Sequence, residues 1–219
     1  MNYSKHLFIT CIIFSLIFTR IYSSSANKEF ITSDNLSEVI NSKDIDKVTD
    51  TLNEIKKMNY QGEILPFVKD LWHLKKNKHP DLAWNIVTKD IVRVEIANIL
   101  LQAERNGLID INKENLHNYI LGLLSSNDVY VVQKSIFTLS TFDYNSDVDD
   151  ILSIAKKRNK ITFRAAVITL SKMCNSKSDR ALDKLFKLVR EDNLKQYIVN
   201  TRKRMKNFKE RSNWCNEDE

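Results

Sequence analysis

The stretch of this chain that comes closest to a metal site is a run of alternating acidic and amide residues. The run consists of Asp143, Asn145, Asp147 and Asp149. An EF-hand calcium loop begins in this way, because Ca²⁺ prefers oxygen ligands at alternating positions. The pattern then fails, since Val148 stands where the loop needs glycine and Ile154 where it needs a bidentate glutamate. The run therefore predicts an Asp/Asn-rich turn between two helices and no metal site.

Other residue types that perform chemistry are scattered. His73, His79 and His117 do not form a zinc-binding spacing with one another or with the cysteines. His73 lies between Trp72 and Leu74, which predicts a partly buried histidine whose hydrogen bonds are satisfied. The chain contains no glycine-rich phosphate loop and no nucleophile elbow. We therefore expect a protein that is not an enzyme, has no cofactor and takes no small-molecule substrate.

The composition predicts the class of fold that must position these residues. Only 3 glycines and 2 prolines occur among 219 residues, and sheets depend on turns that favour both residue types. Hydrophobic residues make up 42% and charged residues 28% of the chain, as in ordinary globular domains. An all-α protein with short Asn/Asp/Ser/Lys connections is predicted.

The first 26 residues have the pattern of an export signal. Lys5 and His6 precede an apolar run over residues 7–18, and small residues at Ser24 and Ala26 suit a signal peptidase. Arg20 interrupts the run, so about 20 consecutive apolar residues for a membrane span are not present. We predict a cleavable signal, cut after Ala26, and a periplasmic or secreted protein with no stable membrane span after cleavage. An uncleaved anchor and a buried helix are the alternatives.

Export changes how the charge and the cysteines are interpreted. Loss of Lys5 and Arg20 with the signal lowers the formal net charge from +6 to +4. Such mild basicity in an exported protein makes nucleic acid an unlikely partner. Cys174 and Cys215 remain, and an oxidising compartment would permit a disulfide that ties down the end of the chain. One buried and one loose thiol is the equally weighted alternative.

Three segments of the chain repeat the same pattern. They cover residues 90–97, 128–135 and 159–166, at spacings of 38 and 31 residues, and each leads into a leucine. Each copy starts with a capping Asp or Asn and carries a small residue at its centre. The small residues Ala97, Ser135 and Ala166 predict close approach of neighbouring helices, with larger apolar residues around them in the core.

These repeats resemble the HEAT family of α-solenoids. The resemblance rests on the opening Asp, on the cores Val94-Glu95-x-Ala97 and Phe163-Arg164-x-Ala166, and on the closing Leu. It covers about residues 90–192, with a weaker echo over 44–75. Only Arg164 supplies the arginine that is usual in this family, and the spacings are uneven. The resemblance implies a short right-handed α-solenoid of antiparallel helix pairs; an irregular helical bundle is the alternative.

The remaining elements follow from local signals. We expect residues 27–43 to form a polar leader and a short helix, 44–212 the repeat domain and 213–219 a flexible acidic tail. Within the repeat domain, Asp44 is predicted to open a helix, and Pro66 and Pro80 to lie in the first turns of two others. Asn193 is predicted to begin the last helix. The total is about eleven helices after removal of the signal.

Two surfaces are candidates for binding a partner. The second helices of HEAT-like pairs line the concave side, which implies one candidate face on them. That face comprises His117, Asn118, Leu121, Asp149, Asp150, Ser153, Lys184 and Lys187. A basic strip on the last helix comprises Lys195, Arg202, Lys206 and Lys209. Mixed charge around Leu121 and an adjacent basic strip favour another protein as partner, although solvated helix faces have the same composition.

The function expected from these observations is that of an exported protein-binding helical-repeat module. One concrete version is a periplasmic immunity protein that neutralises a toxin, by analogy of fold and location. A structural or scaffolding solenoid of an exported assembly is the alternative. A nucleic-acid-binding solenoid is the third hypothesis and would require that residues 1–26 are not an export signal.

Overall fold

The computed structural model describes residues 31–58, 62–142, 144–157, 159–173 and 175–212, with side chains as far as Asn207. The expected signal, the acidic tail, Cys174 and Cys215 lie outside this part of the chain, and so do both alternatives for the two cysteines. The described residues form eleven α-helices, one 3-10 turn and no β-strand. The all-α prediction is confirmed.

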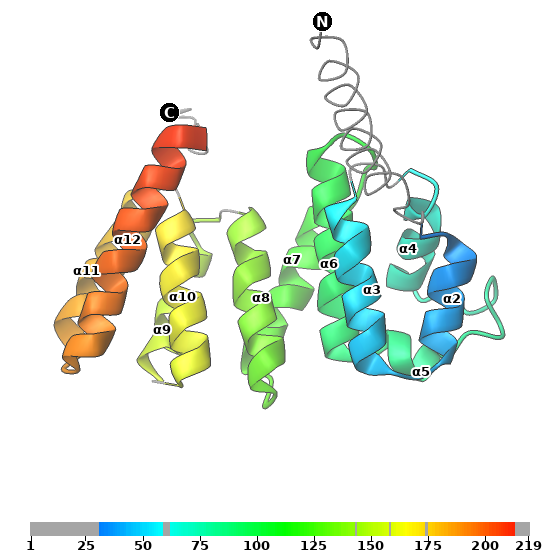
Figure 1. Cartoon of the computed structure of the whole chain (residues 1–219), viewed down its shortest axis with the longest axis horizontal. Coiled ribbons are helices and arrows are strands. Elements are labelled where there is room, and N and C mark those ends of the chain that lie inside the picture. Colours follow the sequence, from blue (N-terminus) through cyan, green and yellow to red (C-terminus); the bar gives the residue numbers. More distant parts are fainter. Residues whose placement is uncertain (1–30, 59–61, 143, 158, 174, 213–219) are drawn as a thin grey trace, which may run out of the picture. The chain divides into compact units, whose positions relative to one another are not determined.

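The helices follow one another with short connections (Figure 1). Their bounds are α2 Ser33–Asn41, α3 Ile45–Lys57, α4 Leu65–Trp72, α5 Trp84–Val87, α6 Asp90–Arg105, α7 Lys113–Gly122, α8 Val129–Phe142, α9 Asp147–Lys156, α10 Lys160–Lys172, α11 Ser176–Leu188 and α12 Asp192–Ser212, with the 3-10 turn η1 at Leu123–Ser125.

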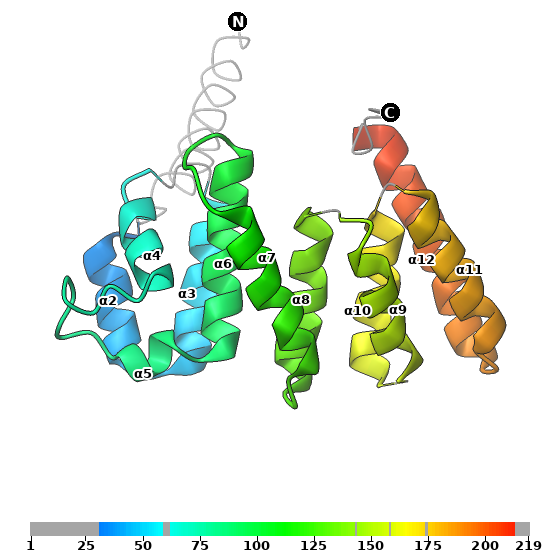
Figure 2. The same cartoon turned by 180° about the vertical axis from the view of Figure 1, so that it is seen from behind.

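Within the unit that begins at Ser33, most helices are arranged in two rows. Helices α6, α8, α10 and α12 pack each against the next, and α3 packs against α6 (Figure 1). On the other side, α7 packs against α8, and α9 packs against both α10 and α11 (Figure 2). At the N-terminal end, α2 packs against α3, and α4 against α6. Each predicted repeat thus contributes one helix to each row.

Side-chain caps account for where several helices begin. The Asp44 carboxylate accepts the backbone N–H of Lys47 at 3.1 Å, and Asn159 caps α10 by accepting from Ile161 at 2.9 Å. Asp128 accepts from the N–H of Tyr130 at 2.8 Å just before α8. Such caps are worth about 1 kcal/mol each, because they satisfy amide groups that have no partner inside the helix.

The prediction that Asp90 caps its helix was wrong. Asp90 is the first helical residue of α6, and the preceding Lys89 provides no side-chain cap. The Asp90 carboxylate instead accepts the hydroxyl of Tyr119 from α7 at 3.0 Å. The sequence pattern predicted that this carboxylate caps α6, but it forms a hydrogen bond between α6 and α7 instead.

The small residue at the centre of each repeat lies in the core, as predicted. Ala97, Ser135 and Ala166 are each 0% exposed, and the large apolar residues that flank them in sequence are buried as well. The Ser135 hydroxyl donates to the carbonyl of Val131 at 2.8 Å, so its burial leaves no polar group unsatisfied. The Thr169 hydroxyl donates to the carbonyl of Ile136 at 3.2 Å and ties α10 to α8.

Two predicted helix starts need correction, and one is confirmed. Pro66 lies in the first turn of α4, as expected. Pro80 lies in a turn, and the short helix begins only at Trp84, whose indole N–H donates to the carbonyl of His79 at 2.9 Å. That bond closes residues 79–84 into a turn. The last helix begins at Asp192, one residue before the predicted Asn193.

Two side chains are more exposed than their neighbours in sequence suggested. Phe186 is 37% exposed, because α11 buries Leu182 and Leu185 and turns the next position away from the core. His73 is exposed at the end of α4, although Trp72 beside it is buried. Among the described helices, none is long and apolar enough to cross a membrane.

Candidate binding groove

A groove of about 600 Å³ crosses helices of the first row. Its lining comes from α3, α6, α8 and α10 and from Asn106, which follows α6. It consists of Lys56, Asn98, Gln102, Arg105, Asn106, Gln133, Lys134, Phe137, Ser140, Thr141 and Lys172. Ten of the eleven lining residues carry a cation, a side-chain amide or a hydroxyl, and their aliphatic parts and the Phe137 ring also face the groove. Such groups can hold a polar, negatively charged ligand, whereas an apolar ligand would leave them unpaired.

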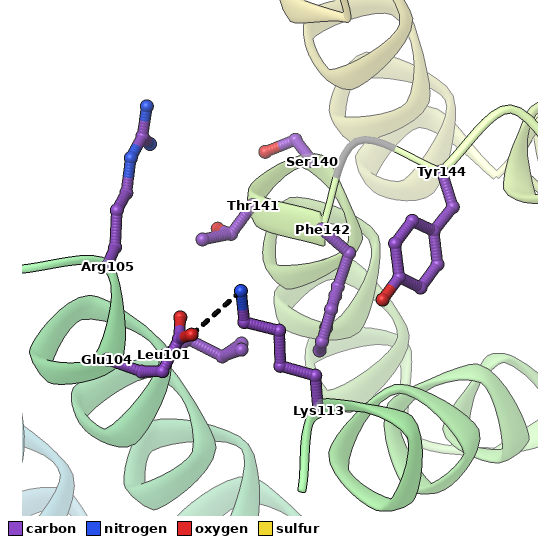
Figure 3. A pocket seen from close by; sticks show the side chains of 8 residues that line it. All are labelled: Leu101, Glu104, Arg105, Lys113, Ser140, Thr141, Phe142 and Tyr144. Atoms are coloured by element: carbon purple, nitrogen blue, oxygen red, sulfur yellow. Dashed lines mark ion pairs between the residues drawn. The ribbon is translucent and has the colours of Figure 1, made fainter. Parts of the chain in front are cut away.

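A smaller pocket of about 440 Å³ adjoins the groove (Figure 3). The two share Arg105, Ser140 and Thr141, so they are neighbours on the surface. In the smaller pocket, the ammonium of Lys113 lies 2.8 Å from the Glu104 carboxylate. Figure 3 shows the Phe142 and Tyr144 rings on the other side of Lys113.

A buried carboxylate that is not part of the lining holds two lysines of the groove. Glu95 is 1% exposed and forms an ion pair with Lys134. Its other oxygen lies 3.5 Å from the ammonium of Lys56, which also donates to Asn53 at 3.0 Å. A carboxylate buried to this degree requires such partners, because removing the charge from water costs several kcal/mol. Glu95 therefore fixes the position of two ammonium groups from α3 and α8.

The positions of the other cations have a local cause. Lys56, Arg105 and Lys172 lie in the last turns of α3, α6 and α10. Cations are favoured there because the free carbonyl groups give a helix C-terminus partial negative charge. Because α3, α6 and α10 run in the same direction in Figure 1, these ends lie on one side. Lys134 lies in the middle of α8, where only the pair with Glu95 explains its position.

Most of the predicted second-helix face is exposed, with one exception. Asn118, Asp149, Asp150, Ser153, Lys184 and Lys187 are exposed, and Leu121 is half-buried. His117 is only 8% exposed, so it is not available on that face. Its Nε2 lies 2.9 Å from the carboxylate of Asp147, which is 1% exposed. The His117 ring also packs edge-on against Phe142 and Tyr144, and this pair therefore joins α7 to α9 in the core.

Ion pairs also occupy part of the two predicted surfaces. Asp149 accepts from Lys177 at 2.8 Å, and this hydrogen bond lowers the pKa of the Asp149 carboxyl. Arg202 lies 2.6 Å from Asp183, so part of the expected basic strip on α12 is neutralised by α11.

The other residues of the basic strip on α12 differ in their exposure to solvent. Lys195 is half-buried, with its ammonium 5.9 Å from the ring centre of Phe186, and Lys206 is exposed. The side chain of Lys209 lies outside the described residues. None of the described residues of the two predicted surfaces lines the groove or the adjoining pocket.

The groove contains residues that sequence reasoning missed. The expectation assigned binding to the second helices and to the last helix, whereas the cations of the groove belong to α3, α6, α8 and α10. One signal was present in the sequence. Glu95 is the only acid in the stretch 91–97, whose other residues are apolar except for Arg93. A charge at a core position predicts a buried ion pair, but the sequence does not specify its partners.

The buried cation Arg93 has a structural role. The Arg93 guanidinium donates to the carbonyl of Trp72 at 2.7 Å and lies 4.0 Å from the centre of the Trp72 ring, with the Tyr119 ring at 5.2 Å. Burial lowers the pKa of Arg93 and raises the pKa of Tyr119. This cluster fastens α4 to α6 and α7, and its cation does not face the groove.

In the described part of the chain, no three His, Cys, Asp or Glu side chains gather in a way that could hold a metal ion. Comparisons with models of protein families, with curated proteins and with solved structures found no match.

Proposed function

We propose that this chain is a non-enzymatic module that binds another protein, built as a short HEAT-like, right-handed α-solenoid. Two features support the solenoid over an irregular bundle. Helices alternate between the two rows from α6 to α12, and the small residues of the repeats occupy equivalent buried positions. In such an array each helix pair buries its apolar face only against its neighbours, so an extended surface remains for a partner.

The groove across α3, α6, α8 and α10 carries the proposal. Its lining comes from four helices, so its geometry depends on the row of helices and not on one loop. Binding sites on rigid elements are preorganised, which lowers the entropic cost of association. The dominance of lysine, arginine and amide side chains favours a polar macromolecular surface over an apolar small molecule.

The location of the protein is part of the proposal. The pattern of residues 1–26 supports an exported, periplasmic or secreted protein, with the binding domain beyond the cleavage position. An immunity protein that neutralises a toxin is one specific form of such a binder. A scaffolding solenoid of an exported assembly would use the same groove for a permanent contact, so the lifetime of the complex separates the two.

A nucleic acid is the second candidate partner, because the groove is basic. Two carboxylates count against it: Glu95 neutralises part of the charge of two lysines, and Glu104 pairs with Lys113 in the adjoining pocket. A nucleic-acid site is usually built from cations that face phosphates along the whole path. We therefore favour a protein partner.

Site-specific photo-crosslinking tests the proposed function. A photoreactive amino acid at the exposed Thr141 lies in the groove, one at Ser153 lies on the second-helix face, and one at Glu38 on α2 is the control. The full chain is expressed in the cells that produce it, so that its own N-terminal segment directs it. One protein adduct, formed from Thr141 or Ser153 but not from Glu38 and reproduced with the two purified proteins, is expected. Absence of any specific adduct from both positions would refute the proposed function.

A further inference from the structure

We propose that a slot between α9 and α11 is a second docking site for the partner, and that it takes an apolar side chain flanked by carboxylates. The proposal rests on the protein-binding function above and names the kind of segment that the second row of helices would bind. The position of the slot, its apolar lining and the cations around it each support this occupant.

The slot lies where α9 and α11 end. It has a volume of about 250 Å³ and is lined by Ala155, Lys156, Leu185, Leu188 and Val189. Both helices contribute residues of their last turn, so their C-terminal ends lie side by side. Ala155 is small, so space remains between it and the larger Leu185 on the facing helix.

Four of the five residues that line the slot are apolar. Ala155, Leu185 and Val189 are buried, whereas Leu188 is 52% exposed. Single exposed leucines are common on protein surfaces, but this one borders a concavity whose other apolar residues are buried. In protein interfaces, a few side chains that enter such pockets carry most of the binding energy. An apolar side chain of the partner would remove Leu188 from water, while the Lys156 ammonium can stay in solvent at the rim.

The ends of α9 and α11 carry a surplus of positive charge. Residues 152–157 and 184–191 contain five cations and one acid, Glu191, which gives a formal net charge of +4. All five cations are exposed: Lys156, Lys157, Lys184, Lys187 and Arg190. The free carbonyl groups at two helix C-termini amount to about one negative charge, so a surplus of about three positive charges remains.

None of these five cations forms an ion pair with another residue in the described part of the chain. The carboxylate of Asp149 attracts Lys156 and Lys184. However, Asp149 is itself paired at 2.8 Å with Lys177, in the first turn of α11. Carboxylates of a partner are therefore the groups that would balance the cations around the slot.

A lipid membrane and a second copy of this chain are the competing occupants. A membrane surface is best bound by apolar side chains that protrude into it, whereas most of the apolar side chains here line a recess. A second copy could present Leu108, which is 48% exposed and lies two positions before Asp110. One acid would balance only part of the positive surplus, so a more acidic segment of another protein fits better.

The test uses fluorescence anisotropy with labelled eight-residue peptides and protein purified after expression of the full chain. The probe is Glu-Ser-Glu-Leu-Leu-Glu-Ser-Glu. One comparison peptide carries Ser in place of both Leu, and the other carries Gln in place of every Glu. We expect the probe to bind at least about fivefold more tightly than either comparison peptide, because each of them lacks one of the two contributions.

Two leucine variants locate the apolar contact. Leu188→Ser removes the exposed apolar side chain that lines the slot and should weaken probe binding about fivefold or more. Leu108→Ser is the matched control, because Leu108 is exposed to nearly the same degree and lies outside the slot. Its effect on probe binding should stay below about twofold. Circular dichroism confirms that each variant is folded.

Two lysine variants locate the charge. Lys184→Gln/Lys187→Gln removes two cations beside the slot and should weaken probe binding about two- to fivefold. Lys47→Gln/Lys76→Gln removes two exposed cations, one in α3 and one in the turn after α4, and should change it by less than about twofold.

The cross-link from Ser153 connects the slot with the natural partner. Ser153 lies one turn before Lys156 on α9, so a partner bound at the slot should form an adduct there. Leu188→Ser should reduce this adduct, and Leu108→Ser should leave it unchanged.

Equal binding of the probe and either comparison peptide would overturn the slot proposal, and so would equal losses of affinity in Leu188→Ser and Leu108→Ser. Binding to vesicles of phosphatidylcholine and phosphatidylglycerol that Leu188→Ser abolishes would assign the slot to a membrane instead. Self-association in sedimentation equilibrium that the same substitution abolishes would assign it to a second copy. An adduct from Thr141 alone, combined with any of these results, would leave the protein-binding function standing at the groove. Failure of all cross-links would remove the function itself.

Discussion

Removing Lys134 should destabilise the protein more than removing the buried acid that it pairs with. Glu95 is 1% exposed, and in Lys134→Met its remaining cationic partner among the described residues would be the ammonium of Lys56 at 3.5 Å. Loss of one partner from a fully buried ion pair costs about 3–5 kcal/mol. Because Lys134 is 37% exposed and water can reach the site, we reduce the expected loss to about 1–3 kcal/mol.

The reverse substitution, Glu95→Met, should cost much less. Methionine fills a similar volume among the apolar neighbours of α6, and the two lysines can extend into solvent when their counterion is gone. A change within about 1 kcal/mol of either sign is expected, since replacing a buried charge by an apolar group is often neutral. A larger loss of stability in Lys134→Met than in Glu95→Met is expected for a buried carboxylate that is stabilised by its cations.

Urea unfolding followed by circular dichroism at 222 nm measures both free energies of unfolding. Lys184→Met on the exposed surface of α11 is the control for loss of one lysine and should be close to the parent. The double variant Glu95→Met/Lys134→Met should recover most of the stability lost in Lys134→Met. If Glu95→Met proved as destabilising as Lys134→Met, or if the double variant recovered nothing, the assigned role of Glu95 would be refuted.

Three further predictions concern the rest of the domain. Ala166→Phe should lower the free energy of unfolding by about 1–3 kcal/mol or more, because the residue is 0% exposed in the core; a melting curve equal to the parent's would contradict this. His117→Phe should lower the free energy of unfolding by about 1–3 kcal/mol, because it leaves the buried Asp147 without its main partner. Asp147→Asn should lower it less. Equal losses of the two variants in urea titrations would argue against the pair. The lowered pKa of Asp149 means that its pair with Lys177 contributes stability above the ordinary Asp pKa of about 3.9, and that this contribution disappears as the pH falls through the lowered pKa. The difference in melting temperature between the parent and Lys177→Gln should accordingly be constant near neutral pH and shrink in acid, and a difference that grows in acid would disprove the assignment.

Local patterns predicted the features that depend on a few neighbouring residues. The caps at Asp44 and Asn159 follow from side chains that reach an amide two or three positions later. The burial of Ala97 and Ala166 follows from periodic apolar residues around a small one. These signals suffice for an all-helical domain, because capping and helix amphipathicity act within one or two turns.

The same kind of signal failed where a partner distant in sequence decided the outcome. Asp90 had the pattern of a cap but bonds Tyr119, and His117 had the position of a surface residue but pairs with Asp147. In both cases the partner lies on another helix, about thirty positions away. A charged or polar side chain can form its hydrogen bond with a nearby backbone group or with a residue on another helix. The spacing of residues along one helix does not distinguish these two outcomes.

By itself, the sequence determined that the chain is helical, where the helices capped by Asp44, Asp128 and Asn159 begin, and which small residues enter the core. Only the tertiary structure decided that Lys56 and Lys134 meet at Glu95 and that their groove lies on the first-row helices. The physical reason is range: helix formation is governed by residues within about four positions, whereas a buried charge selects its partners through the packing of whole helices.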